Sequence, residues 1–176
     1  MDVAHQQLCT AIELWFNNKY PVSTYTLAYA AHEIIHYYGK KSGKTKRTLI
    51  FDSDKKKLIT RLEKAAHFFK HANKDHDKTF EFDPGLTMGI LVFSIFGLLE
   101  IVNEMEDLEA LEYAFVNWIY LYDPEWLGEA ALEFSKKTWG SEMPQEVRKY
   151  FTKLNKYEFM QYSLKKWNDH KNKDLS

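Results

Sequence analysis

Residues 31–45 read AHEIIHYYGKKSGKT and hold one complete catalytic signature and a string close to a second. The first is H-E-x-x-H, in which two histidines one helical turn apart bind zinc and the glutamate serves as general base. The second is close to G-x-x-x-x-G-K-[ST], a loop that holds phosphate with its backbone N–H groups. The two signatures imply different chemistry, and their spacing and surrounding elements separate them.

The phosphate loop departs from its signature in spacing and in context. Gly39 and Gly43 enclose three residues where the signature requires four, and Tyr38 stands where the first glycine should be. A working loop also follows a buried strand and opens a helix, whereas GKKSGKT follows a predicted helix. We interpret residues 39–47 as a solvated basic loop whose lysines could touch phosphate without specificity.

His32 and His36 pass the first geometric test for a shared metal ion. They lie one turn apart on a segment with helical periodicity, where both rings can reach one ion, and Glu33 could serve as base or ligand. On a helical wheel at about 100° per residue, they belong to a narrow stripe opposite the aliphatic side. The stripe consists of Tyr25, Tyr29, His32 and His36, and the aliphatic side of Leu27, Ala31, Ile34, Ile35 and Tyr38. A zinc peptidase would also need a third ligand and an edge strand, which the sequence does not show.

A second histidine pair, His67 and His71, also lies one turn apart on a predicted helix, and Asp75 and His76 follow it. Two antiparallel helices that each carry such a pair could converge on one divalent ion or two, as in metal sites inside helical bundles. The E-x-x-H step at residues 33–36 is also typical of di-iron bundles, but the second step that they require is absent. The alternative interpretation gives all four histidines structural or solvated roles, because surface histidines on two-faced helices are common.

Apolar residues recur three and four positions apart along most of the chain, which predicts an all-α fold. We expect a single-domain helical bundle of about six to seven helices over residues 1–170, with a polar C-terminal tail at 171–176. Helices are predicted at 3–17, 23–38, 54–73 and 88–99, and three more begin near Asp107, Asp123 and Met143. Two alternating stretches, 48–51 and 79–82, could pair as a minor two-stranded ribbon.

Local signals set the expected boundaries of these helices. Ser23 or Thr24 is expected to cap the second helix, and Gly39 to end it. The segment 88–99 is apolar on every face but too short to span a bilayer, which predicts the central buried helix. A single last helix would run from residues 143–144, with a proline in its first turn, up to the polar segment 165–176, which is expected to be frayed.

The charge balance and the cysteine count exclude several classes of protein. With 24 basic and 25 acidic residues, the chain has no net field that would recruit nucleic acid or an anionic membrane. Its single cysteine, Cys9, excludes an internal disulfide, and no secretory signal is visible at the start. We therefore expect a cytoplasmic protein that does not act in a membrane.

Three blocks of the sequence resemble a group of small, largely uncharacterised bacterial helical proteins. The blocks are PVSTYTLAYAAHEIIH at 21–36, AAHFFKHANKD at 65–75 and FEFDP at 80–84. The resemblance implies an all-helical fold. The residues of this chain that fall on positions usual in the group are Glu33, His36, Lys70 and His71. Asparagine is more usual at His67, and His32 is particular to this chain, which shifts weight towards the residues that match.

The FFKHA block also resembles the motif region of HEPN domains, helical bundles whose RNA-cleaving members carry an arginine followed four to six residues later by a histidine. Arg61 and His67 satisfy that spacing. The polar residue usual after the arginine is Leu62 here, and if His71 is the motif histidine then Ala66 occupies the arginine position. The resemblance implies a metal-independent ribonuclease in which the histidine moves a proton and Arg61 steadies the phosphorane charge.

These residues are consistent with three functions. The leading interpretation is divalent metal binding, by zinc, manganese or iron, with metal-dependent hydrolysis as an option in which Glu33 accepts the proton of a bound water. The ligands would then be His32, His36, His67 and His71. The first alternative is a HEPN-like ribonuclease of a toxin or defence system, acting on RNA through Arg61 with His67 or His71. The second is a non-catalytic interaction module, for which we expect a homodimer or a protein partner at the apolar helices near Met88 and Trp118.

Overall fold

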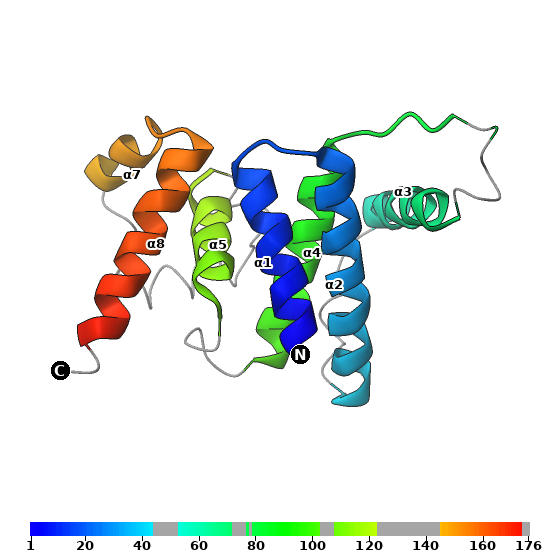
Figure 1. Ribbon diagram of the computed structural model, residues 1–176, viewed down its shortest axis with the longest axis horizontal. Coiled ribbons are helices and arrows are strands. Elements are labelled where there is room, and N and C mark those ends of the chain that lie inside the picture. The colour runs from blue at the N-terminus through cyan, green and yellow to red at the C-terminus, as the bar shows by residue number, and fades with distance from the viewer. Residues whose placement is uncertain (44–52, 72–76, 78, 103–107, 123–144, 174–176) are drawn as a thin grey trace. The chain divides into compact units, whose positions relative to one another are not determined.

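The computed structural model describes residues 1–43, 53–71, 77, 79–102, 108–122 and 145–173, and every regular element within them is a helix. The helices are α1 (Asp2–Phe16), α2 (Pro21–Lys41), α3 (Ser53–Lys70), α4 (Gly85–Ile101), α5 (Ala110–Tyr122), α7 (Gln145–Phe151) and α8 (Lys156–Lys173) (Figure 1). The prediction of an all-α fold is confirmed. The chain groups into two compact units, Met1–Asp107 and Leu108–Ser176. The single domain expected over residues 1–170 stays a prediction.

In the first unit, α4 is covered by its neighbours, as its sequence predicted. Most of its residues are buried, and they lie on every side of the helix. α2 contacts α1 and α4 along much of its length, and α3 contacts α4 and α2 over a shorter stretch. Figure 1 shows α1, α2 and α4 side by side. The Asp83 carboxylate accepts a hydrogen bond from the Gly85 N–H at 2.8 Å and so satisfies a free donor in the first turn of α4.

The N-terminus of α2 differs from its prediction. The helix begins at Pro21, whose fixed φ angle suits the first helical position. Thr24 lies inside the first turn, where its Oγ1 is 3.0 Å from the Tyr20 carbonyl oxygen. Capping by Ser23 or Thr24 was therefore the wrong prediction, because the proline sets the start of the helix one turn earlier.

The C-terminus of α2 also differs from its prediction. Gly39 does not end the helix; it is buried within it, and the helix continues to Lys41. The chain leaves the helix through Gly43, whose φ of 71° is accessible to glycine without strain.

Small residues on the buried face of α2 allow α4 to approach closely, and the Ser94 hydroxyl of α4 lies 3.2 Å from the Ala28 carbonyl oxygen.

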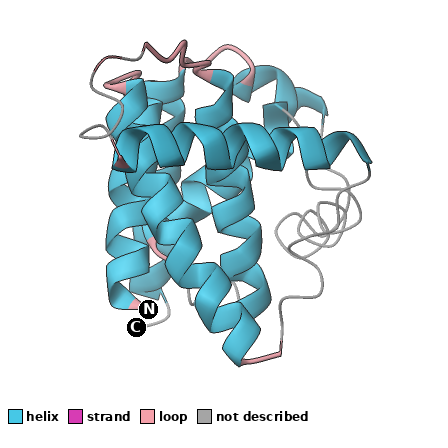
Figure 2. Ribbon diagram, turned by 90° about the vertical axis from the view of Figure 1, so that its right-hand side faces the viewer, coloured by secondary structure: helices cyan, strands magenta, loops and turns pink. Residues whose placement is uncertain are grey.

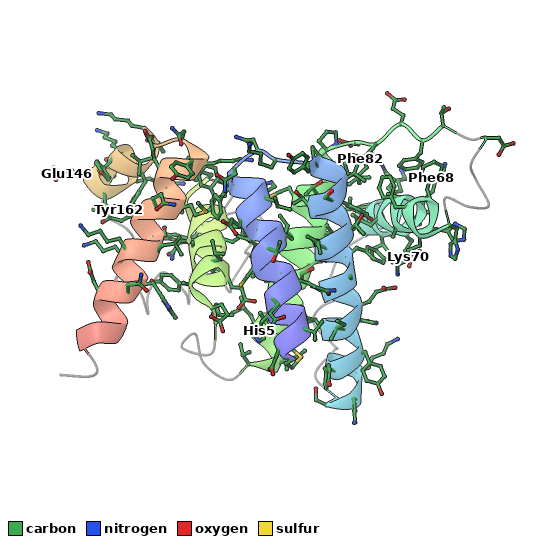
Figure 3. The ribbon with its side chains drawn as sticks, in the orientation of Figure 1. His5, Phe68, Lys70, Phe82, Glu146 and Tyr162 are labelled. Atoms are coloured by element: carbon green, nitrogen blue, oxygen red, sulfur yellow. The ribbon has the colours of Figure 1, made fainter. Side chains whose placement is uncertain are left out.

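Residues 79–82 form no strand, and their two phenylalanines pack on neighbouring helices. Phe80 stacks on Phe68 of α3 with ring centres 5.0 Å apart, and Phe82 lies 5.5 Å from Phe69 and 5.4 Å from Tyr25 (Figure 3). Residues 79–82 therefore contribute no strand to the predicted ribbon. Their alternation does not distinguish the two cases, because alternate side chains of an extended segment share one side whether that side packs on a sheet or on a helix. Residues 48–51 lie outside the described part of the chain. Figure 2 shows α3 lying across the other helices of this unit.

In the second unit, α5 packs against α8, and Phe159 is central to the contact. Its ring lies 5.2 Å from Trp118 of α5 and 5.6 Å from Phe151 of α7. Trp118 is only 8% exposed, so it belongs to the core of the chain and not to an open surface. Met88 of α4 is half-buried. The dimer or partner expected at these two residues stays a prediction.

The last helix predicted from residues 143–144 is in fact two helices, α7 and α8, separated at 152–155. Asn155 and Glu158 form a reciprocal capping box at the start of α8. Asn155 Oδ1 accepts from the Glu158 N–H, and Glu158 Oε2 accepts from the Asn155 N–H, each at 3.0 Å. One continuous helix was the wrong prediction. The apolar periodicity continues across residues 152–155, and the break there is visible only from the capping hydrogen bonds. α8 then continues to Lys173, beyond the point near residue 165 where the helix was expected to end.

The two helices predicted to begin near Asp107 and Asp123 have different outcomes. The first is α5, which begins at Ala110, and Asp107 itself lies outside the described residues. The second lies wholly outside them. Within the described ranges, none of the helices combines the length and the apolar character needed to cross a bilayer.

Asn155→Ala is expected to lower the free energy of unfolding by about 1 kcal/mol, because it removes the side-chain cap of α8. Urea denaturation followed by far-UV circular dichroism would measure the change. Asn168→Ala, at an exposed position inside α8, is the matched control and is expected to have no destabilising effect. Equal destabilisation by the two substitutions would contradict the capping role of Asn155.

Candidate functional site

Tyr25 anchors the polar stripe of α2 to α3. Its side chain is fully buried, and its hydroxyl donates a hydrogen bond to the Leu62 carbonyl oxygen of α3. Burial raises the pKa of Tyr25 well above its ordinary value, so the phenol keeps its proton and remains a donor. Its ring also lies 6.0 Å from that of Phe69 on α3. The stripe that the sequence predicted on α2 is therefore an interhelix contact at this end.

Glu33 and Lys70 join the same two helices further along. Lys70 Nζ lies 2.5 Å from Glu33 Oε2 and 5.1 Å from the centre of the Tyr29 ring (Figure 3). Burial, together with the Glu33 carboxylate, raises the pKa of Tyr29. Both partners of the ion pair are about half exposed, so the pair contributes less than about 1 kcal/mol to stability. The pair matters more for the expected role of Glu33 as a base, because its carboxylate is already bound to the Lys70 ammonium group.

His32 lies at the edge of the buried face of α2. Its ring centre is 6.3 Å from Phe93 of α4 and 6.0 Å from His36. Its Nδ1 has no contact with solvent and no hydrogen-bond partner among the described residues. Burial, with a smaller contribution from His36, lowers the pKa of His32 to about 4, so its ring is neutral at pH 7. Burial and the nearby Lys40 also lower the pKa of His36.

The buried face of α2 is rotated from the aliphatic side that the helical wheel indicated. It consists of Thr24, Tyr25, Ala28, Ala31, Ile35 and Gly39. Tyr38, predicted on the aliphatic side, is 40% exposed. The rotation occurs because α4 packs against the small residues of α2, which lie beside His32. The expectation that the histidines avoid the buried side is therefore wrong for His32.

A metal ion held by two imidazoles requires their nitrogen lone pairs, which lie in the ring planes, to converge on one point. With metal–nitrogen distances of about 2.1 Å, the two ring centres come about 5 Å apart. The rings of His32 and His36 are 6.0 Å apart and within 20° of parallel, so their planes do not meet near both rings. The rings of His67 and His71 are 4.5 Å apart and tilted by 47°. The geometry closer to a chelate therefore belongs to His67 and His71.

The two histidine pairs are in different environments. His67 of α3 is exposed, and His71, the first residue after this helix, is half-buried. At helical spacing both lie about opposite the residues that α3 buries, Leu62, Ala65 and Ala66. In the ranges that the structure describes, no three histidine, cysteine or carboxylate side chains lie close enough to hold one ion together. The described residues thus form two separate pairs. Asp75 and His76, predicted as further ligands, lie outside these ranges.

Arg61 is paired with a residue that the sequence did not single out. One guanidinium nitrogen lies 2.7 Å from Asp83 Oδ2, and both side chains are exposed. At about 100° per residue, Arg61 and His67 are about 120° apart around α3, and Arg61 and His71 about 80° apart. The structure does not bring Arg61 onto one face with His67. The sequence did not indicate Asp83 as a partner, because it lies 22 residues from Arg61 and directly after the stretch 79–82 that was predicted as a strand.

Comparison of the chain with models of protein families, with curated proteins and with solved structures found no match. The resemblances to a bacterial helical group and to HEPN domains therefore stay predictions.

Tyr25→Phe is expected to lower the free energy of unfolding by about 1 kcal/mol, because it removes a buried hydrogen bond and keeps the ring. Glu33→Gln breaks only an exposed ion pair and is expected to cost less than about half as much. Urea denaturation of both variants at neutral pH would measure the two effects. A larger loss for Glu33→Gln would mean that the ion pair, and not the buried hydroxyl, holds α2 to α3.

His32 is expected to destabilise the chain as pH falls. Its pKa is about 4 in the folded chain and 6.5 in the unfolded chain, so between these values only the unfolded state binds the proton. This contribution is therefore negligible above pH 7 and lowers the free energy of unfolding by about 2.5 kcal/mol near pH 4.5.

Urea denaturation at a series of pH values, with chelator present, tests the role of His32. His32→Gln should remove this part of the pH dependence. His67→Gln, which changes an exposed histidine on α3, should retain it. Identical pH profiles for the wild type and His32→Gln would contradict the prediction.

Proposed function

We propose that the chain binds a divalent transition-metal ion through His67 of α3 and His71, the residue that directly follows this helix. The observation that carries the proposal is the geometry of this pair, with ring centres 4.5 Å apart and planes tilted by 47°. The separation of these ring centres is close to the about 5 Å that two imidazoles on one ion require. Exposure of His67 allows an ion to reach the pair without opening the core.

The donor atoms favour particular metals. Imidazole nitrogen suits zinc, copper, iron and nickel, whereas manganese and magnesium prefer carboxylate and water oxygen. Of the ions expected from the sequence, zinc and iron fit the pair better than manganese. Water would complete the coordination of an ion held by two protein nitrogens.

The proposal is metal binding and does not include hydrolysis. Catalytic zinc sites use three protein ligands, and this pair supplies two. The expected base, Glu33, is on α2 and is paired with Lys70. The His32 and His36 pair would need a rotamer change before it could chelate, because its rings are nearly parallel.

Isothermal titration of untagged protein with zinc and with nickel tests the proposal. The wild type is expected to bind an ion, and His71→Ala is expected to lose most of that affinity, because one imidazole alone is a weak ligand. His36→Ala is expected to bind as the wild type does. His5→Ala, which removes a histidine of α1 outside both pairs, is the matched control.

Two results would contradict the proposal. Wild-type protein that takes up neither ion would exclude metal binding by the pair. Loss of binding in His36→Ala but not in His71→Ala would move the site to α2.

A further inference from the structure

A local excess of positive charge lies on α7, α8 and the segment that joins them. Residues 145–169 contain six basic and three acidic side chains, although the whole chain has a net charge of −1. The basic residues are Arg148, Lys149, Lys153, Lys156, Lys165 and Lys166. The near-zero total therefore conceals a segment that can attract an anion.

Tyr150 of α7 presents its ring to solvent and is 53% exposed. Its ring centre lies 6.2 Å from that of Tyr162 and 5.5 Å from that of Phe151. Both contacts are steeply inclined, at 60° and 70°, and no described ring stacks in parallel on Tyr150. The two neighbours support the ring and leave it open to a flat partner.

Tyr162 and Lys166 lie on α8, and the Tyr162 ring adjoins α7 (Figure 3). Lys166 Nζ is 5.7 Å from the centre of the Tyr162 ring. Two further exposed lysines are sequence neighbours of these residues: Lys149 precedes Tyr150, and Lys165 precedes Lys166. One ammonium group, that of Lys166, thus lies beside the Tyr162 ring, and Lys149 is the sequence neighbour of the open Tyr150 ring.

We propose that Tyr150, Tyr162 and Lys166 form a surface that binds single-stranded nucleic acid. A base would stack on Tyr150, and the backbone phosphates would lie near Lys149 and Lys166. Every base has a π-face, so such stacking needs no particular sequence, whereas a duplex keeps its faces covered. An acidic protein could use the lysines but would leave the open tyrosine unexplained. The surface shares no residue with the metal-binding pair.

Fluorescence anisotropy with labelled oligothymidylate and oligouridylate tests this surface, using the full chain in chelator. Both strands are expected to bind, with affinity that falls as salt rises. Tyr150→Ala should weaken binding about fivefold or more, through loss of one stacked base. Lys166→Gln should make the slope of log affinity against log salt shallower by about 0.7, through loss of one phosphate contact.

Two matched controls separate the surface from general effects of substitution. Tyr157 is 52% exposed on α8 but lies about 140° around the helix from Tyr162, so Tyr157→Ala should not change the affinity. Lys57→Gln removes the same charge from an exposed position on α3 and should leave the salt slope unchanged. Circular dichroism would show that each variant retains the helical fold.

The absence of binding to either strand at low salt would overturn the proposal. So would equal losses in Tyr150→Ala and Tyr157→Ala, or a duplex of the same length that binds as tightly as the single strands. Tighter binding of oligouridylate would support the surface with RNA as its ligand, and tighter binding of oligothymidylate would support it with DNA.

Discussion

The first unit depends on one constraint: α4 has no polar face, so it must be covered on every side. Its buried residues lie all around the helix. Removing each large apolar side chain from water contributes about 1.5–3 kcal/mol, far more than an exposed ion pair supplies. α2 meets this demand with small residues, and the two helices approach until the Ser94 hydroxyl reaches the Ala28 carbonyl oxygen. The choice of which face α2 buries follows from the burial of α4.

The burial of α2 against α4 creates the polar contact between α2 and α3. Once the small residues of α2 turn towards α4, Tyr25 is fully buried and needs a partner for its hydroxyl, which the Leu62 carbonyl oxygen supplies. His32, beside those small residues, loses solvent and with it the ability to hold a proton at neutral pH. Glu33 lies further round the helix, where it can pair with Lys70 in the presence of water.

Two histidine pairs with identical spacing have different properties because their helices bury different faces. On α2 the pair adjoins the buried face, and its rings are nearly parallel. At the end of α3 the pair lies opposite the buried residues, its rings are tilted, and His67 is exposed. Spacing alone describes both pairs as one helical turn. It does not reveal which ring is desolvated, or whether two ring planes meet at a point where an ion could sit.

The sequence by itself determined the all-α class, the burial of the 88–99 segment and the helical placement of His32, His36 and His67, because helical periodicity is a local property of the chain. The helix predicted over 54–73 ends earlier, at Lys70, so His71 lies just beyond it. Tertiary structure decided what periodicity cannot express. It paired Lys70 with Glu33, 37 residues away in the chain, and Arg61 with Asp83, 22 residues away. It also packed the alternating Phe80 and Phe82 against helices and not into a sheet. These outcomes depend on which faces meet when α4 is buried, and that is a property of the packed helices together.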